Sequence, residues 1–291
     1  MAPSALIAEG GESRVYALGA ERILRVLRRP QDPAELCRKQ AFLASLDGRL
    51  PFAVPAIEAI APDGGWTVER RIEGASLLVL LRSLRGGDRA AALTAYAEAA
   101  DALAAISFAD RPYGQLLATD PVTAPDWRSY LRAGLDGFIA ANGAAIEAHC
   151  GAVAMLRARA LDLLAGVAEA PPKVLVHGDY FPGNVMIGSD LAVTGLVDFS
   201  AWTMVGDARY DAVSALTFLE MVGEAGPDDI ALVRRVVLAR HGEALRAPAR
   251  FYRAYFAFAM ADPANAAGPY PRLWPWARAN LAALAEDRLA P

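Results

Sequence analysis

Short apolar runs alternate with polar residues in the first quarter of the chain, a pattern that is typical of half-buried strands. The predicted strands cover Leu6–Ala8, Val15–Leu18, Arg22–Leu27, Phe52–Ile60 and Trp66–Arg70. Another segment of this quarter, Pro33–Leu46, places its apolar side chains at helical spacing instead. The pattern therefore predicts an antiparallel sheet with one inserted helix over residues 1–74.

After Gly74 the pattern changes to long Ala- and Leu-rich segments with a helical period. The predicted helices cover residues 89–106, 126–141 and 144–167, and others follow from about Tyr210 onward with breaks near Gly226–Pro227, Pro248, Pro263 and Pro269–Pro271. We expect an α+β chain with a small N-terminal lobe, residues 1–74, and a larger, mostly helical lobe, residues 75–291. The hinge between them is predicted at Arg70–Gly74.

One segment interrupts the helices with residues that carry chemistry. Apolar, β-branched runs flank a loop that contains His177, Asp179 and Asn184, and a second predicted strand ends at Asp198. Phosphoryl transfer from a nucleotide needs one carboxylate to accept the proton of the attacking hydroxyl, and an amide and a second carboxylate to hold metal ions. The pattern His-x-Asp-x-x-x-x-Asn followed by Asp-Phe parallels the protein-kinase catalytic loop and metal-binding segment. The alternative is an ordinary Asp-, Gly- and Asn-rich turn, which the flanking strands argue against.

Composition narrows the class of protein further. The chain has 291 residues, of which 55% are hydrophobic and 21% charged, with a formal net charge of −4, as expected for a globular protein rather than a nucleic-acid binder. The apolar runs are too short to span a bilayer, and the N-terminus lacks the pattern of a signal peptide. Cys37 and Cys150 form no metal or disulfide framework. These features predict a cytoplasmic enzyme that binds neither membrane nor nucleic acid.

The motifs resemble those of the aminoglycoside phosphotransferase and choline-kinase-like superfamily over nearly the whole chain. The specific matches lie in residues 9–16, 22–29, 66–74 and 174–211. The resemblance implies a protein-kinase-like bilobal fold, with Mg²⁺ and ATP, or GTP as the alternative, as cofactors. Leu50–Pro55 also resembles a stretch of macrolide phosphotransferases, but this hexamer lies in the small lobe and says little about the substrate.

The resemblance assigns roles to the residues of the interrupting segment. Asp179 matches the catalytic base of the family, and Asn184 and Asp198 match its magnesium ligands. His177 is expected to be structural and to tie the catalytic loop to the segment around Asp198. Asp211, in the segment Gly-Asp-Ala-Arg-Tyr-Asp, is expected to cap a helix and to brace the catalytic loop.

Residues of the small lobe match the nucleotide-binding part of the family pattern. Glycines let backbone N–H groups approach phosphate oxygens, and the turn after the first strand resembles the phosphate-covering loop of the family. The expected nucleotide-binding residues are Gly10, Gly11 and Ser13 in this turn, Arg25 in the third strand, and Glu69, Arg70 and Ile72 at the hinge. Gly-Gly between two strands is also a plain hairpin turn.

The small lobe departs from the kinase pattern at one pair of positions. Kinases carry a lysine on the third strand, paired with a glutamate on the following helix, whereas this chain has Arg25. An arginine can still bind phosphate oxygens. The helix partner is open: Glu35 is the nearest acid, and alignment puts Lys39 or Gln40 where the glutamate should be. Arg25 is expected to pair with Glu35 or with nothing.

The leading hypothesis is an O-phosphotransferase that acts on a hydroxyl of an aminoglycoside, a macrolide or a related metabolite; an antibiotic acceptor would make it a resistance enzyme. Acidic residues in the last third would suit a cationic aminoglycoside or would simply be solvated helix faces, so the acceptor stays open. The alternative function is a catalytically silent nucleotide-binding regulatory module, motivated by Arg25. A protein kinase is excluded because Asp179 is not preceded by Arg and Phe181 replaces the loop lysine.

Overall fold

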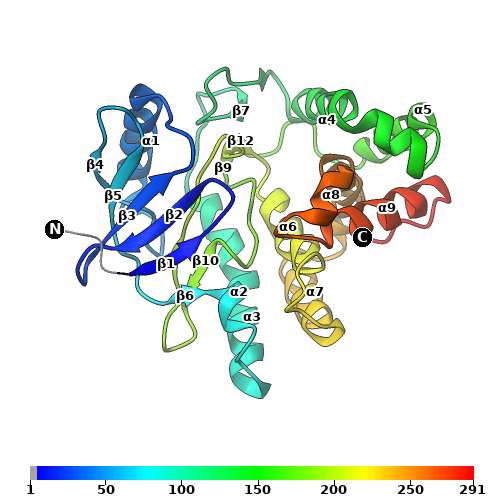
Figure 1. Cartoon of the computed structure of the whole chain (residues 1–291). Coiled ribbons are helices and arrows are strands. Elements are labelled where there is room, and N and C mark those ends of the chain that lie inside the picture. Colours follow the sequence, from blue (N-terminus) through cyan, green and yellow to red (C-terminus); the bar gives the residue numbers. More distant parts are fainter. Residues whose placement is uncertain (1–4) are drawn as a thin grey trace.

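The computed structural model describes residues 5–291, so the first four residues of the segment considered above for a signal peptide lie outside it. The N-terminal lobe is a five-stranded antiparallel sheet with the strand order β1-β2-β3-β5-β4 (Figure 1). Its strands are β1 (Leu6–Glu9), β2 (Ser13–Ala17), β3 (Arg22–Leu27), β4 (Ile57–Ile60) and β5 (Trp66–Arg70). The expected sheet is confirmed, and three of its strands match the expected ranges closely.

The fourth strand begins later than expected, at Ile57 rather than Phe52. The backbone of Ala53 instead bonds to the other lobe: its N–H donates to the carbonyl of Thr194 (2.9 Å), and its carbonyl accepts from the N–H of Leu196 (3.0 Å). A residue whose two backbone groups are used in this way cannot extend β4. The segment before β4 therefore links the two lobes.

Helix α1 (Pro33–Leu46) has the bounds that the sequence predicts. The Asp32 carboxylate caps its start by accepting from the N–H of Ala34 (2.9 Å), and a proline occupies its first position, where the missing N–H costs nothing. Leu36, Leu43 and Leu46 lie on its buried face. In Figure 1 the helix lies beside the N-terminal sheet.

The predicted strands around the catalytic loop divide between two small sheets. One sheet has the order β11-β10-β6 and the other β8-β7-β12-β9. Their strands are β6 (Ala75–Ser76), β7 (Tyr113–Gln115), β8 (Thr123–Ala124), β9 (Val174–Val176), β10 (Val185–Ile187), β11 (Val193–Leu196) and β12 (Met204–Gly206). The expected hairpin is real for β10 and β11, but β9 pairs with β12 instead. The sequence missed β6, β7, β8 and β12 because two or three residues carry too little periodicity.

Helices make up most of the remaining C-terminal lobe (Figure 1). They are α2 (Leu77–Leu80), α3 (Gly86–Ala99), α4 (Trp127–His149), α5 (Val153–Leu164), α6 (Arg209–Leu219), α7 (Pro227–His241), α8 (Arg246–Ala259) and α9 (Leu273–Ala285), with 3₁₀ turns at 100–105, 243–245 and 263–267. The break expected between residues 141 and 144 is wrong. Helix α4 continues because the Asn142 amide donates to the carbonyl of Phe258 (2.9 Å), and the chain turns at Gly151, whose φ is +124°.

Aromatic side chains of α8 fill the core of this lobe. The expected core role of these side chains is confirmed, because all of them are buried: Phe251, Tyr252, Tyr255, Phe256 and Phe258.

The division between the lobes at residue 74 stays a prediction. In the described part of the chain, no single helix is long and apolar enough to cross a membrane, and α4 and α5 pass that test only as a pair bent by 118°.

Candidate active site

A cleft of about 710 Å³ lies where the two lobes meet, and its walls include all of the residues that the sequence predicts for nucleotide, metal and catalysis. The N-terminal lobe contributes Gly10, Gly11, Ser13, Arg25, Glu69, Arg70 and Ile72, and the C-terminal lobe contributes Asp179, Asn184 and Asp198. Residues that are up to 188 positions apart in the chain, Gly10 and Asp198, therefore face one space.

Asp179 and Asn184 are held to each other at the base of the cleft. The Asn184 amide nitrogen donates to the Asp179 carboxylate (3.0 Å) and to the Asp179 carbonyl (2.9 Å). Burial raises the pKa of Asp179 to about 6, the nearby charge of Asp198 adds to this, and the hydrogen bond from Asn184 opposes it. A carboxylate with this pKa is ionised at neutral pH and is still a usable proton acceptor.

Asp198 follows β11 with an unusual backbone conformation. Its φ is +67°, in the left-handed region that residues other than glycine seldom adopt. The N–H of the preceding Val197 donates to the Asn184 carbonyl (2.9 Å), which places the two loops side by side. Among residues 5–291, no side chain or backbone group forms a hydrogen bond or ion pair with the Asp198 carboxylate. Strain at a residue with a free carboxylate is typical of a functional position.

His177 is buried and links the catalytic loop to the segment before Asp198. Its Nε2 donates to the Val197 carbonyl (3.0 Å), and its Nδ1 accepts from the N–H of Asp179 (3.3 Å). Burial lowers the pKa of His177 to about 4. A neutral ring with both nitrogens engaged has no proton to exchange with a substrate at neutral pH, so the expected tying role agrees with these bonds.

Asp211 braces the start of the catalytic loop by accepting two backbone hydrogen bonds. Its two carboxylate oxygens accept from the backbone N–H groups of His177 (2.6 Å) and Gly178 (3.1 Å). Burial raises the pKa of Asp211 to about 7, against the two N–H donors that favour its ionised form. Asp211 lies inside the first turn of α6 and does not cap it, so the expected capping role is wrong and the bracing role is confirmed.

The glycine at the turn before Asp179 is required by the geometry. Gly178 has a φ of +83°, and a Cβ there would lie 2.1 Å from the carbonyl oxygen of Trp202. The glycines of the small-lobe loop differ, since neither Gly10 nor Gly11 has a positive φ and a Cβ at Gly11 would meet open space. The fold alone does not require glycine at position 11. The open space beside it leaves room for a ligand to approach the backbone.

Arg25 pairs with an acid of the neighbouring strand rather than with one on the helix. Its Nε donates to the Glu69 carboxylate (2.9 Å) and its Nη1 to the Ser13 hydroxyl (3.2 Å). Burial acts to raise the pKa of Glu69, but the charge of Arg25 and the hydrogen bonds from Arg25 and Thr67 hold it below its ordinary value. The expected pairing with Glu35 is wrong, because that carboxylate accepts from the Thr119 hydroxyl instead.

Gln40 and Lys39 are the two candidates for the position of the kinase helix glutamate, and their side chains point in different directions. The Gln40 amide donates to the carbonyl of Ile57 in β4 (2.7 Å), which directs it away from the cleft. Lys39 instead lines the cleft. Glu69 was expected only as a hinge residue, so its pairing with Arg25 is a feature that sequence reasoning missed. No local sequence signal could have found it, because Glu69 comes near Arg25 only through the strand register that sets Arg25 opposite Thr67, two residues before Glu69.

The far end of the cleft is apolar, which the sequence did not show. The lining residues that come from α6 onward are Phe218, Met221, Val222, Met260, Tyr270 and Leu273. Phe181 of the catalytic loop stacks edge to face against Tyr270, with 5.6 Å between ring centroids. In the part of the chain that the structure describes, none of the lining residues from α6 onward is acidic.

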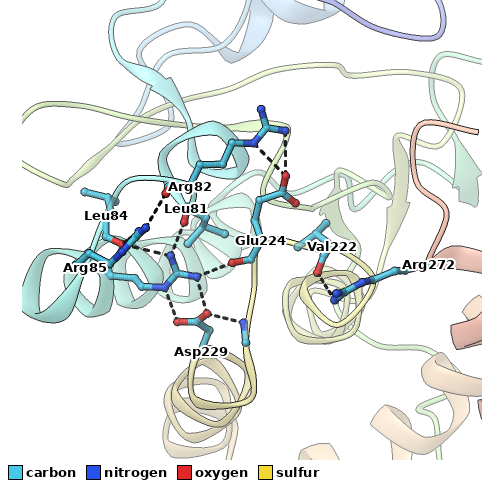
Figure 2. A network of polar contacts seen from close by, with 10 residues as sticks. Leu81, Arg82, Leu84, Arg85, Val222, Glu224, Asp229 and Arg272 are labelled. Atoms are coloured by element: carbon cyan, nitrogen blue, oxygen red, sulfur yellow. Dashed lines mark hydrogen bonds and ion pairs between the residues drawn. The ribbon is translucent and has the colours of Figure 1, made fainter.

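None of the acids considered for a cationic substrate lines the cleft, and all but Asp228 have a partner elsewhere. Figure 2 shows two of them, Glu224 and Asp229. Glu224 pairs with Arg82 (3.0 Å), and Asp229 pairs with Arg89 of α3 (2.7 Å). Arg89 also donates to the carbonyl of Glu224 (2.6 Å) and so ties α3 to the loop before α7. Glu220 pairs with buried Arg253, Glu243 with Arg246, and Asp262 caps a 3₁₀ turn, while Asp228 is exposed on α7.

Comparison with known proteins identifies relatives of this arrangement. The model of the phosphotransferase enzyme family matches residues 5–252. No curated protein matches the sequence at a significant level. The ADP-bound structure of aminoglycoside phosphotransferase APH(2'')-Ib is similar with a TM-score of 0.64 and 15% identity, over 98% of this chain and 93% of that chain.

Two further solved structures are similar over nearly their whole length. The apoenzyme of macrolide 2'-phosphotransferase MphH from Brachybacterium faecium has a TM-score of 0.59 and 18% identity, over 97% of this chain and 91% of that chain. The GDP and kanamycin complex of another APH(2'') protein has a TM-score of 0.61 and 17% identity, over 99% and 94%. At these identities the likeness shows the fold, and the expected protein-kinase-like bilobal fold is confirmed.

Proposed function

This chain belongs to the phosphotransferase enzyme family, and we propose that it is an ATP- and Mg²⁺-dependent O-phosphotransferase that acts on a hydroxyl of a small molecule. One observation carries the proposal: a half-buried carboxylate, an amide and a second carboxylate that has no partner among residues 5–291 face the same cleft. This set has the donors that phosphoryl transfer requires. ATP is the proposed nucleotide, with GTP as the alternative.

Asp179 is the proposed catalytic base. Its carboxylate would accept the proton of the acceptor hydroxyl as the oxygen attacks the γ-phosphorus and the bond from that phosphorus to the bridging oxygen of the nucleotide breaks. The Asn184 amide fixes the carboxylate orientation before substrate arrives. His177 is unsuited to this task because both of its ring nitrogens are engaged by the backbone.

Asn184 and Asp198 fit a magnesium site by the chemistry of their donors. The amide nitrogen of Asn184 is used by Asp179, which leaves its side-chain oxygen available, and the Asp198 carboxylate has no partner in the described chain. Mg²⁺ prefers hard oxygen ligands and keeps waters and phosphate oxygens around it, so two protein donors suffice. The bound ion would neutralise charge on the phosphates.

The small lobe would hold the phosphates and the base of the nucleotide. Gly10 and Gly11 offer an unobstructed backbone at the loop that covers the cleft. Ser13 and Arg25 lie directly behind this loop and bond to each other. Arg70 and Ile72 form the rim at the hinge, where the nucleobase is proposed to bind.

The acceptor is proposed to be a largely apolar hydroxyl compound rather than a polycation. The helical side of the cleft presents aromatic, methionine and aliphatic side chains, and Glu220 and Glu224, which flank the lining residues Met221 and Val222 in the chain, already have arginine partners. A polycation would leave its own charges without partners in such a surface, and unpaired charges away from water are strongly unfavourable. Shape and apolar contact would therefore select the acceptor.

The silent regulatory module remains the competing function. It was motivated by Arg25, but this residue has a buried acid as its partner, so the departure from the kinase pattern leaves no orphaned charge. The three polar groups proposed for catalysis and metal binding are all present at the cleft. A module without turnover would have no chemical need for an uncompensated carboxylate at Asp198.

Nucleotide consumption with a panel of acceptors tests the proposal. The purified protein is given Mg-ATP, or Mg-GTP, with macrolides, aminoglycosides or small amino alcohols, and Asp179→Ala serves as the control. Consumption that one acceptor class stimulates, and that the variant loses, supports the enzyme. Nucleotide binding without consumption for any class would favour the silent module, and stimulation by aminoglycosides alone would contradict the apolar acceptor.

A further inference from the structure

The buried face of α1 contains a lysine where the spacing calls for an apolar residue. Leu36, Leu43 and Leu46 are each at most 4% exposed, and position 39 completes their spacing of three and four. Lys39 occupies it, is half-buried and lines the cleft beside Leu36. A charged side chain in such a stripe is costly unless it has a partner.

No protein group provides that partner in the described chain. Among residues 5–291 no acid lies within ion-pair distance of the Lys39 ammonium, and no acceptor forms a hydrogen bond with it. Burial lowers the pKa of Lys39 and the charge of Arg25 acts in the same direction, whereas the carboxylates of Asp198, Glu69 and Glu12 favour its charged form. Lys39 lines the same cleft as Asp198, so its amine and the proposed metal ligand face one space.

Arg25 is in the opposite situation, because its charge is already matched. Its pairing with Glu69 lies within one sheet, between diagonal neighbours of β3 and β5, and Glu69 is only 5% exposed. The Thr67 hydroxyl donates to the same carboxylate (2.7 Å) and the Ser13 hydroxyl accepts from the guanidinium (3.2 Å). The acid that kinases place on the helix thus comes from the sheet, and the helix supplies a cation instead.

Resting on the proposed function, we infer that Lys39 of α1 binds the phosphate oxygens of the nucleotide, while the Arg25–Glu69 pair shapes the strand wall behind them. A compact ammonium with three donors suits phosphate oxygens as a point charge. The phosphate groups of the nucleotide would supply the negatively charged partner that Lys39 lacks among the described residues.

A chemical label tests this inference on the unaltered protein. The chain contains two lysines, Lys39 and Lys173, and both are half-buried. Lys173 lies outside the cleft lining, with its amine 5.1 Å from the ring centre of Tyr113. The probe is ATP acylated on its terminal phosphate, which transfers its acyl group to a nearby neutral amine with release of ATP and a proton. We expect acylation of Lys39 that excess Mg-ATP suppresses, and no protected labelling of Lys173.

Two variants supply the matched affinity measurement. Lys39→Met should weaken Mg-ATP binding by about 10- to 100-fold, the loss of one or two charge-assisted hydrogen bonds, and should change adenosine binding less than about twofold. Lys39→Arg keeps the charge and should retain most of the affinity. Lys173→Met should bind both ligands as the unaltered protein does. Calorimetry on the folded variants gives these values.

The outcomes separate this inference from the proposed function. Failure of the unaltered protein to bind any Mg-nucleotide would overturn both. Binding of Mg-ATP together with unprotected Lys39, or with unchanged affinity in Lys39→Met, would overturn the role of Lys39 alone. An equal loss of ATP and adenosine in that variant would likewise overturn it, because it would mean that Lys39 supports the fold of α1 rather than the phosphates.

Discussion

Asp211 at the start of α6 and Glu69 in the sheet of the small lobe are both buried acids that accept two hydrogen bonds, but they hold different kinds of group. Asp211 holds backbone, through the N–H groups of His177 and Gly178. Glu69 holds side chains, those of Arg25 and Thr67. Backbone groups cannot move to another partner, whereas a guanidinium can be satisfied from a helix or from a strand. The loop therefore keeps the kinase pattern and the small lobe departs from it.

The largest effect is expected at Asp179, the proposed base in the catalytic loop. Asp179→Asn keeps an oxygen for the Asn184 amide but cannot take up the hydroxyl proton. Turnover should fall by about 10²- to 10⁴-fold, with Mg-ATP affinity within a fewfold of the unaltered protein. Asp190→Asn, in the exposed turn between β10 and β11, is the matched control and should leave turnover unchanged. Near-normal turnover in Asp179→Asn would remove this residue from catalysis.

The next effect tests whether Asp211 holds the backbone. Asp211→Ala leaves two buried N–H groups without an acceptor, so the free energy of unfolding should fall by about 2–5 kcal/mol. Turnover should fall as well, because the loop before Asp179 loses its anchor. Urea denaturation of the variant measures the first effect. A loss below about 0.5 kcal/mol, the size of a surface substitution, would show that the brace does not matter.

Glu69→Gln makes the corresponding change in the small lobe, with a smaller expected effect on stability. Glutamine keeps an acceptor oxygen for Thr67 and Arg25 but removes the charge, so we expect a loss of about 1–2 kcal/mol. Arg25 is also 23% exposed, and water can solvate part of its guanidinium. Urea denaturation beside Asp211→Ala gives the comparison. A loss as large as that of Asp211→Ala would mean that the two acids contribute equally to stability, which contradicts the expected difference between them.

The smallest expected effect is a pH dependence of stability that arises from the neutral ring of His177. Its folded-state pKa of about 4 lies below its ordinary value of 6.5, so between these values the unfolded chain binds a proton that the folded chain does not. This residue therefore makes stability fall as pH drops through that window. The stability advantage of the unaltered protein over His177→Asn should shrink by about 1 kcal/mol between pH 6.5 and 5.5. The exposed His149→Gln is the control, and a pH-independent advantage would contradict a neutral buried ring.

Much of the fold follows from local sequence, because the signals that set it are local. Helix α1 has its expected bounds because the apolar spacing that predicts it lies within the helix, and because the Asp32 cap directly precedes it. The break near Asn142 was predicted wrongly because a tertiary hydrogen bond to Phe258 stabilises that turn of α4. Strand β12 escaped prediction because its three residues are a strand only when β7 and β9 flank them.

The residues of the candidate site also fall into two groups, those that a local motif predicts and those that only the fold brings together. Asp179, Asn184 and Asp198 lie within one short stretch of sequence, and the motif itself brings them together. The pairing of Arg25 with Glu69 spans 44 residues and depends on the register of β3 with β5, which no local pattern records. The orientation of Lys39 and the apolar end of the cleft depend likewise on how helices pack, so they become visible only in the structure.

The central claim is that this cleft transfers a phosphoryl group to an acceptor hydroxyl. ³¹P NMR of the protein with Mg-ATP and a macrolide tests it most directly, because the method sees the fate of each phosphate. We expect a new phosphate-monoester signal that grows in step with ADP and is absent with Asp179→Asn. Loss of ATP to inorganic phosphate alone, or a monoester signal that persists in the variant, would contradict it.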